Sequence, residues 1–451
     1  TIRPADEMVT TAMVSDDAQI KPITANEAIE ALSSLDSYHS IEPAVVTQVM
    51  EQSAKVRLQD GSEVNIGWQG LAWARAYIND DKQAAPPSIA KDILTTGDIV
   101  MVSAVESGYR LSQLPEVSAA LVSLATDNGA IKAAVGGFSF NQSQFNRVTQ
   151  AKRQVGSNIK PFIYSAALEN GYNLASIVND APINQWDRSS GVVWRPKNSP
   201  PVYNGEIRFR LALAQSKNVI AVRLLREVGL DKIIPYLATF GFNPHDLPRN
   251  ESLALGSASL TPIEVATGFA TFANGGFLIK PYLIERIEDS FGKVLFQANP
   301  AIACDNCDQS IDKVSESSNA PLNSEDIFNF NAADNFDDIE LTARVINKAP
   351  RIISAQNAFL ITEALNSAIW GADWNIKPFW QGTGFRARVL KRRDIAGKTG
   401  TTNEAKDAWF SGYSRRIVTT SWIGFDNPSR NLGQSSYNSN LSKDQTTGKE
   451  F

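Results

Sequence analysis

One stretch of this chain combines side chains that can carry out nucleophilic chemistry. It is QVGSNIKPFIYSAALENG, in which Ser157 is followed by Lys160 and then Pro161. Proline is tolerated only in the first turn of a helix, so we expect a helix to begin close to Ser157. Unpaired N–H groups and the helix dipole favour negative charge at that end. Lys160 lies three residues on, on the same face. The stretch predicts a serine nucleophile with a lysine base.

The residue that acts as base decides which kind of serine chemistry is possible. The only histidines are His39 and His245, and neither lies near a serine in a motif, so a Ser-His-Asp triad is not favoured. A lysine can act as base if burial or a second cation lowers its pKa, and Lys398 is the candidate cation. In the alternative interpretation Ser157 is an ordinary helix cap and Lys160 a surface residue. Ser-x-x-Lys alone would favour that alternative, because the spacing is common.

A second motif, Ser216-Lys217-Asn218, lies between the apolar helical patterns of residues 211–215 and 219–228. This arrangement predicts a short corner that projects Ser216 and Asn218 into a cleft. Serine and asparagine are also ideal helix caps, so a plain cap is the alternative.

A third motif, Lys398-Thr399-Gly400-Thr401, lies in a strand pattern. Gly397 and Gly400 indicate close approach by another backbone or a ligand. An edge strand here would bind a peptide-like substrate by strand addition, whereas an ordinary hairpin with a glycine bulge is the alternative. Together the three motifs, in this order and in one domain, are far more specific than any one of them.

The composition is that of an ordinary globular protein. The chain has 451 residues, of which 43% are hydrophobic and 20% charged, and its net charge is −5. This length predicts two or three domains. Basic runs are short, and the one at residues 386–393 is interpreted as a solvated rim, so nucleic acid is not expected as a partner. No apolar run is long enough to span a membrane. The opening residues lack the basic and apolar regions of a signal peptide.

The N-terminal part is expected to hold a linker and a small β domain. Residues 1–42 read as a linker with one short helix, whose apolar side is formed by Ala28, Ile29, Leu32 and Leu35. Residues 43–112 alternate in the manner of strands, with hairpin turns at Asp60-Gly61 and at Gly108. Several short strands in such a span indicate an oligonucleotide/oligosaccharide-binding (OB)-like barrel. A spacer without a ligand of its own is the alternative.

Residues 113–451 predict a larger mixed domain. Two strands flank residues 127–129, helices dominate to about residue 290, and a further helix is expected at 355–369. Three strands close the domain. Strands at both ends of a helical middle predict an α+β fold whose sheet pairs the early strands with the last three. Residues 304–343, rich in Asp, Asn and Ser, are expected to form a surface insertion.

The two cysteines, Cys304 and Cys307, form a lone CxxC. Such a pair can be a redox centre, half of a zinc site or a local disulfide. Without a second CxxC and with so few histidines, zinc is not favoured, and no metal is expected. We favour a structural clip or two incidental thiols over a redox function.

The sequence resembles the transpeptidase domain of bifunctional (class A) penicillin-binding proteins, closest to the 1A type, over residues 116–426. The three motifs carry the likeness, as do NDAPI, WRPKNSPPVYNGEIRFRLALAQSKN and ESLALGSASLTPIEVATGFATFANGG. The strand-rich region near 43–112 is similar to the OB-like domain that this family places before the transpeptidase. The resemblance implies a serine penicillin-binding/β-lactamase-like α+β domain, with no cofactor.

The resemblance also implies roles for individual residues. Ser157 attacks the penultimate D-Ala carbonyl of a peptidoglycan stem peptide, and Lys160 accepts its proton. Ser216 relays a proton to the leaving D-Ala with help from Lys398. The substrate is held by the remaining motif residues, Asn218, Thr399, Gly400 and Thr401. The backbone N–H groups of Ser157 and Thr401 form the oxyanion hole.

Partners and location follow from the same resemblance. The implied partners are D-Ala-D-Ala stem peptides with an amine acceptor, β-lactams that acylate Ser157, and a lipoprotein activator at the OB-like region. The implied location is the periplasmic face of the bacterial inner membrane. Because the family's membrane-anchored glycosyltransferase half and C-terminal helix are not found in these residues, we expect a part of a longer protein.

Three rival functions stay open from the sequence. A D,D-carboxypeptidase shares every motif and differs only in whether water or an amine reaches the acyl-enzyme. A serine β-lactamase needs a deacylating base, but the nearest string, Glu363-Ala-Leu-Asn366, is one residue short and is expected to be helical. A penicillin-binding sensor usually lacks the long segment WRPKNSPPVYNG.

Overall fold

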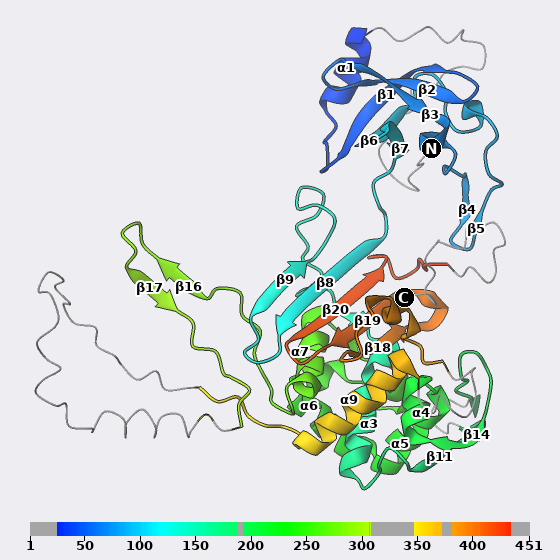
Figure 1. Cartoon of the computed structure of the whole chain (residues 1–451). Helices are drawn as coiled ribbons and strands as arrows, with labels where there is room; N and C mark the ends of the chain where they lie inside the picture. Colours follow the sequence, from blue (N-terminus) through cyan, green and yellow to red (C-terminus); the bar gives the residue numbers. More distant parts are fainter. Residues whose placement is uncertain are drawn as a thin grey trace, which may run out of the picture.

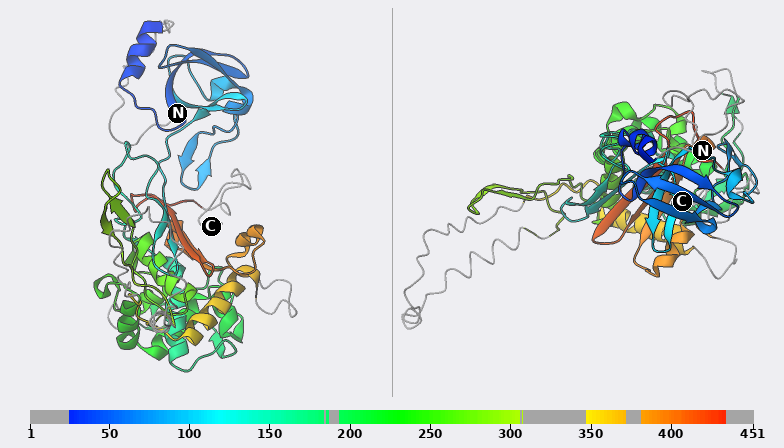
Figure 2. Two further views of the ribbon diagram at one scale, coloured as in Figure 1. Left: turned by 60° about the vertical axis from the view of Figure 1, so that its left-hand side comes forward. Right: turned by 90° about the horizontal axis from the view of Figure 1, so that it is seen from above.

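Two five-stranded antiparallel sheets organise the chain, each with its own hydrophobic core. The computed structural model describes residues 25–183, 185–186, 193–305, 307, 347–371 and 381–433. The N-terminal sheet forms a small unit at one end of the molecule, and the second sheet lies against a group of helices (Figures 1 and 2). No helix within these ranges is long and apolar enough to cross a membrane.

The N-terminal sheet has the strand order β3-β2-β1-β6-β7. Its strands are β1 (Ile41–Val49), β2 (Ser53–Leu58), β3 (Glu63–Gly67), β6 (Ile99–Val105) and β7 (Gly108–Ser112). The two predicted hairpins are confirmed, because β2 pairs with β3 and β6 with β7. Gly61 and Gly108 adopt the positive φ that these turns require. The sheet begins at Ile41, and the domain limits at 43 and 113 stay predictions.

Shorter elements complete this unit: α2 (Trp68–Leu71), β4 (Tyr77–Asn79), β5 (Lys82–Gln83) and η1 (Ala90–Asp92). The predicted N-terminal helix is α1 (Ala25–Ser33). Its apolar side was predicted too broadly. Leu32 is buried with Val45, but Ile29 and Leu35 are more than a third exposed. Because the helix ends at Ser33, Leu35 no longer follows its face. The side chain of Ala28 lies outside the described residues.

The second sheet has the order β18-β19-β20-β8-β9, so the early strands pair with the last three, as predicted. The strands are β8 (Ser118–Ala125), β9 (Ile131–Val135), β18 (Ala396–Thr401), β19 (Asp407–Tyr413) and β20 (Ile417–Gly424). The helices are α3 (Lys160–Glu169), α4 (Phe209–Ala214), α5 (Asn218–Val228), α6 (Leu230–Thr239), α7 (Pro262–Ala273) and α9 (Ala355–Trp370). Helix α7 packs on β8 and β20, and α9 packs on the edge strand β18.

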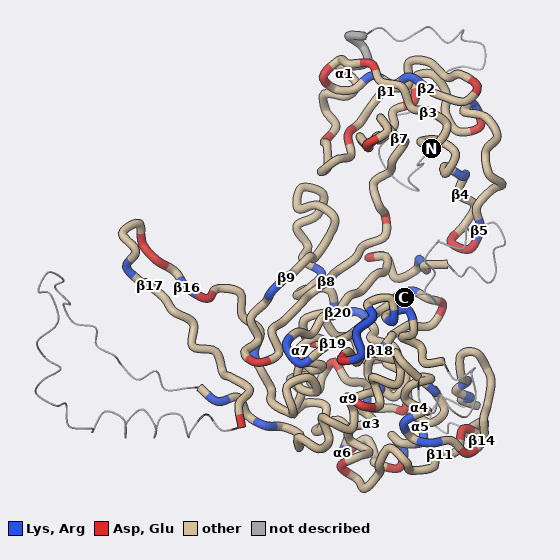
Figure 3. The backbone as a smooth tube through the Cα atoms, viewed as in Figure 1, with Lys and Arg blue, Asp and Glu red and all other residues tan. Residues whose placement is uncertain are grey.

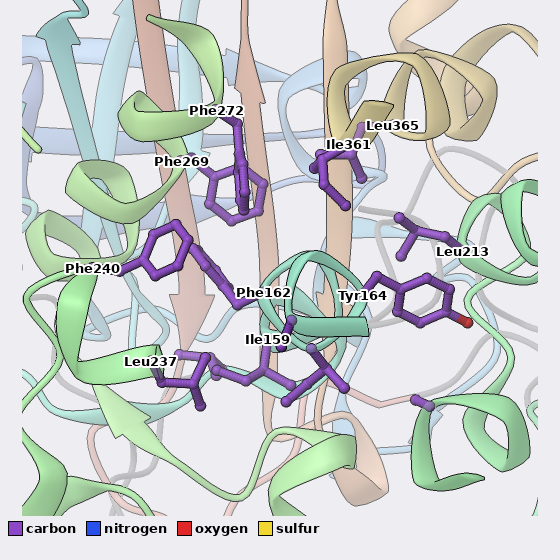
Figure 4. Packing of buried hydrophobic residues seen from close by; sticks show 14 of the residues in the cluster. Ile159, Phe162, Tyr164, Leu213, Leu237, Phe240, Phe269, Phe272, Ile361 and Leu365 are labelled. Atoms are coloured by element: carbon purple, nitrogen blue, oxygen red, sulfur yellow. The ribbon is translucent and has the colours of Figure 1, made fainter. Parts of the chain in front are cut away.

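Helix α3 is the centre of the larger core, with α4, α5, α6 and α9 around it. The apolar residues Ile159, Phe162, Ile163, Ala166 and Ala167 follow helical spacing and are buried, and so are the other side chains from Lys160 to Ala167. A helix surrounded on all sides has no solvent face. Figure 4 shows Phe162 and Tyr164 pointing to opposite sides of this helix. The central position of α3 is the reason that Lys160 is withdrawn from water.

Several two-stranded ribbons and short helical turns connect these elements. The ribbons pair β10 (Arg153–Gln154) with β15 (Ser259–Leu260), β11 (Ile177–Asp180) with β14 (Gly205–Arg208), β12 (Gln185–Trp186) with β13 (Val193–Trp194) and β16 (Arg286–Glu288) with β17 (Val294–Gln297). The helical turns are η2 (Gly156–Ile159), η3 (Pro244–Asp246), η4 (Glu251–Leu255), η6 (Phe385–Leu390) and η7 (Asn403–Ala405).

The β16–β17 hairpin reaches away from the helical body (Figure 1). After it, Cys304 and Cys307 are joined by a disulfide, which is the local-disulfide interpretation of the CxxC. Apart from residues 304, 305 and 307, the predicted insertion at 304–343 lies outside the described residues.

The segment after β20 joins the two units. Arg430 Nε donates to Asp80 Oδ1 at 2.8 Å, in the turn between β4 and β5, and Arg430 Nη1 donates to Glu116 at 3.0 Å. The backbone N–H of Asn431 donates to the other oxygen of Asp80. The tip of this OB-like hairpin is therefore tied to the end of the transpeptidase-like sheet.

Replacing Phe162 by alanine is expected to lower the free energy of unfolding by about 3–5 kcal/mol. Its ring contacts four other phenylalanine rings, with centroids 5.0–5.4 Å away. Chemical denaturation measures the loss. Phe291→Ala is the matched control, because that ring is 94% exposed, and it should change stability by less than about 0.5 kcal/mol. Equal effects of the two substitutions would contradict the central place of α3.

Candidate active site

The turn η2, which carries Ser157, lies directly against the edge strand β18. A Cβ at Gly156 would stand 2.6 Å from the carbonyl oxygen of Thr401 and 3.0 Å from its nitrogen. A Cβ at Gly400 would stand 2.6 Å from the carbonyl oxygen of Val155. Both distances are too short for any side chain, so glycine is needed at both positions. The close approach predicted for Gly400 is therefore found, and its partner is the backbone beside Ser157.

Lys160 does not point at Ser157 but at the corner between α4 and α5. Its amine donates to the carbonyl oxygen of Ser216 at 2.6 Å, to Ser216 Oγ at 3.1 Å and to Asn218 Oδ1 at 2.6 Å. The predicted short corner is confirmed, with Ser216 in the left-handed region at φ 55°. Ser157, one helical turn before Lys160, is partly exposed beside this cluster.

Lys398 completes the cluster from the side of β18. Its amine donates to Ser216 Oγ at 2.9 Å and to the carbonyl oxygen of Thr399 at 2.8 Å. Ser216 Oγ thus lies between two buried amines. Burial lowers the pKa of Lys398 to about 7. Burial, together with the neighbouring Lys398, holds the pKa of Lys160 well below its ordinary value. The lowered pKa makes the neutral form, which a base requires, easier to reach than in an exposed lysine.

The Asn218 side chain is held at both ends. Its Oδ1 accepts from Lys160, and its Nδ2 donates to the carbonyl oxygen of Lys197 at 2.8 Å. Asn198, twenty residues upstream, caps α5 from outside the helix. Its Oδ1 accepts from the backbone N–H groups of Asn218 and Val219 at 2.9 and 3.2 Å. The orientation of the amide is thereby fixed before any ligand arrives.

A buried ion pair stabilises the Ser216 corner on the side that faces away from Lys160. Lys217 Nζ lies 3.0 Å from Asp180 Oδ2, and Asp180 is fully buried. The other oxygen of Asp180 accepts from Asn198 Nδ2 at 2.7 Å. The middle residue of the Ser-Lys-Asn motif therefore faces away from Lys160 and anchors the corner to strand β11, at whose end Asp180 lies.

Hydrogen bonds join four of the predicted residues, Lys160, Ser216, Asn218 and Lys398, and the turn that carries Ser157 lies against Gly400 and Thr401 of β18. Sequence reasoning missed Asn198, Asp180 and Thr383, whose Oγ1 accepts from Thr399 Oγ1 at 2.8 Å. Asn198 lies in the stretch WRPKNSPPVYNG and Asp180 in NDAPI. Both stretches contributed to the family resemblance, but it implied no role for either residue. No short-range signal indicates which of their side chains meet the corner.

Lys217→Met is expected to lower the free energy of unfolding by about 3–5 kcal/mol, because Asp180 would stay buried without its cation. Denaturant titration measures the change. The control is Arg392→Met, which breaks an ion pair whose side chains are both more than half exposed and should cost no more than about 1 kcal/mol. A small loss for Lys217→Met would mean that the corner does not depend on the ion pair.

The chain matches two family models and is similar to known proteins. Residues 119–439 match the family model of the penicillin binding protein transpeptidase domain, and residues 14–117 match that of the penicillin-binding protein OB-like domain. Penicillin-binding protein 1A of Vibrio cholerae is 46% identical over 434 residues, which are 95% of this chain and 50% of the relative. The Escherichia coli protein of the same name is 46% identical over 440 residues, 94% and 51% of the two chains.

The fold agrees with these matches. The crystal structure of penicillin-binding protein 1A from Haemophilus influenzae superimposes with a TM-score of 0.75 at 40% identity, covering 91% of this chain and 56% of that one. The chain spans about half the length of the curated relatives it matches. With a transpeptidase-family match over most of its length and an OB-like match before it, the chain belongs to the penicillin-binding protein family.

Proposed function

We propose that this chain carries a peptidoglycan D,D-transpeptidase that works through a serine acyl-enzyme and is acylated by β-lactams. The observation that carries the proposal is the pair of buried amines, Lys160 and Lys398, on either side of Ser216 Oγ and one helical turn from Ser157. A serine needs a base to become a nucleophile, and an amine with a lowered pKa supplies one at neutral pH.

In the first half of the reaction Ser157 Oγ attacks the penultimate D-Ala carbonyl of the donor stem peptide. Its proton passes to the neutral amine of Lys160. The negative charge on the carbonyl oxygen is held by the backbone N–H groups of Ser157 and Thr401. The contact between Gly156 and Thr401 supports this role, because it places the two backbone segments side by side.

The C–N bond to the terminal D-Ala then breaks. The leaving amine takes a proton that passes from Lys160 through Ser216 Oγ, with Lys398 as the other hydrogen-bond partner of that hydroxyl. Asn218 binds the amide of the stem peptide, and Thr399 and Thr401, with Gly400 between them, hold the terminal carboxylate on strand β18. An acceptor amine attacks the acyl-enzyme and gives up its proton by the same relay, which restores Ser157 and forms the cross-link.

The rival functions differ in the fate of the acyl-enzyme. A carboxypeptidase would release it to water instead of an amine. A β-lactamase would need a base for deacylation. Glu363, the nearest candidate, lies within helix α9, and Arg210 Nη2 donates to its carboxylate at 3.3 Å, so it serves as an ordinary helical residue. We therefore favour the transpeptidase.

The location and partners form part of the same proposal. We place the chain at the periplasmic face of the bacterial inner membrane, where stem peptides are exposed. We also propose a lipoprotein activator as the partner of the OB-like unit. Trp73 and Ile78 leave about half of their surfaces exposed there. Pull-down of the OB-like unit with periplasmic lipoproteins tests this part.

Incubation with a penicillin should give a single stable adduct on Ser157, seen by intact mass and located by peptide mass spectrometry. Ser157→Ala should abolish the adduct, and Asn218→Ala should weaken acylation without abolishing it. Ser88→Ala, an exposed serine of the OB-like unit, is the matched control and should be acylated normally. Rapid penicillin hydrolysis without an adduct would indicate a β-lactamase. A D-Ala-D-Ala peptide offered with an amine separates cross-linking from simple release of D-Ala.

The acylation rate should rise with pH as Lys160 loses its proton, with the midpoint well below the ordinary pKa of lysine. Lys398→Met removes the neighbouring charge that helps to lower the pKa of Lys160. That pKa should therefore rise, and the acidic limb of the rate profile should move to higher pH. The pH dependence of penicillin acylation measures the shift. Lys232→Met, an exposed lysine on α6, should leave the profile unchanged. A limb that stays in place in Lys398→Met would contradict the assignment of Lys160 as base.

A further inference from the structure

A threonine outside the three motifs lies beside the third one. Thr399 Oγ1 donates a hydrogen bond of 2.8 Å to Thr383 Oγ1, which belongs to the loop before η6. Thr383 is separated from the third motif by fifteen residues and has no pattern of its own in the sequence. Its place in the fold therefore has to be argued from contacts.

The loop that carries Thr383 is fixed to two helices of the site. The backbone N–H of Thr383 donates to the carbonyl oxygen of Ala214 at 3.1 Å, at the end of α4 and just before the Ser216 corner. The N–H of Gly384 donates to the carbonyl oxygen of Ala368 in α9 at 2.9 Å. A Cβ at Gly382 would stand 2.1 Å from that same oxygen, so the loop can lie this close only with glycine there.

The hydroxyl of Thr383 still has a proton to give. A hydroxyl has one donor and two acceptor positions, and Thr383 already accepts from Thr399. Among the described residues, no acceptor for the Thr383 proton is found. The side chain is half-buried, so this proton can reach a ligand. Thr399 and Thr401 share one face of β18 by strand alternation, and Thr383 contacts the first of them.

The charge around this position suits an anion. Lys398 precedes Thr399, and five basic residues follow Thr383 along the chain, in and after η6: Arg386, Arg388, Lys391, Arg392 and Arg393. Figure 3 shows a run of Lys and Arg residues beside β18. Within this run Arg392 forms an ion pair with Asp394. A potential of this sign draws a carboxylate toward the hydroxyls.

We propose that Thr383 is a specificity-determining residue that donates a hydrogen bond to the carboxylate of the ligand. That group is the terminal carboxylate of the donor stem peptide, or the equivalent carboxylate of a β-lactam. The assignment rests on the proposed function, since it presumes that Ser157 is acylated by these ligands. The carboxylate then accepts from the hydroxyls of Thr401 and Thr383, the latter on a loop anchored to α4 and α9. Thr399, whose one proton goes to Thr383, orients that hydroxyl.

Thr383→Val tests the proposal, because it keeps the shape of the side chain and removes the hydroxyl. The second-order rate of acylation by a penicillin should fall about 10- to 100-fold, as expected for the loss of a hydrogen bond to a charged group. Acylation by the methyl ester of the same penicillin, which has no carboxylate, should change less than about threefold. Thr383→Ser should behave like the parent chain with both compounds.

Controls separate this role from others. Thr239→Val, an exposed threonine on α6, should leave both rates unchanged, and thermal unfolding shows whether each variant is folded. An equal fall with penicillin and ester would mean that Thr383 only positions Thr399, and it would overturn the proposal, as would no fall with either. If the parent chain is not acylated at all, the proposed function fails first, and this assignment fails with it.

Discussion

The arrangement of the site depends on keeping two lysine amines out of water next to one hydroxyl. Removing an ammonium from water is costly unless it loses its proton or finds strong partners. Here burial lowers the pKa of each amine, and each donates to oxygens of the neighbouring motifs. Burial of Lys160 follows from the position of α3 at the centre of the helical core. The packing of the domain thus produces the buried amine that the proposed mechanism uses as its base.

Two kinds of contact hold the three motifs close enough for both lysine amines to reach the Ser216 hydroxyl. Between η2 and β18 the backbones approach so closely that Gly156 and Gly400 leave no room for a side chain. At the Ser216 corner the support is polar, through Asn198 and the ion pair of Asp180 with Lys217. Such a buried pair gives little net stability compared with an apolar core, but it allows one arrangement only. Backbone contact therefore positions η2 against β18, and polar side chains position the Ser216 corner.

Much of this fold could be predicted from local patterns, because strands, turns and caps are set by nearby residues. The hairpin turns at Gly61 and Gly108 and the pairing of early with late strands were all predicted. Contacts between individual side chains far apart in the sequence could not be predicted. The apolar spacing at Ile159, Phe162 and Ile163 marks one buried face of α3, but nothing local shows that other helices cover its remaining face. Thr383 was missed because its contact with Thr399 depends on how the loop is anchored.

The orientation of the Lys160 side chain could not be predicted for the same reason. Spacing alone put it on the face of Ser157, which is correct for the helix but does not say which acceptors the amine prefers. In the folded chain its nearest acceptors belong to a corner more than fifty residues away. A base that is hydrogen-bonded to Ser216 is already part of a relay, whereas one bonded only to Ser157 would have no route to the leaving group.

Hydrogen bonds and ion pairs at the end of the second sheet also connect the site to the OB-like unit. Arg153 Nε donates to Asp407 Oδ1 at 2.7 Å, and Thr402 Oγ1, directly after the third motif, donates to the other oxygen of Asp407. Arg153, in β10, also donates to the carbonyl oxygen of Asp426, four residues before Arg430. The ion pair of Arg430 with Asp80 then reaches the OB-like hairpin. The segment after β20 therefore contacts both Arg153, which pairs with Asp407 beside the third motif, and Asp80 of the OB-like hairpin.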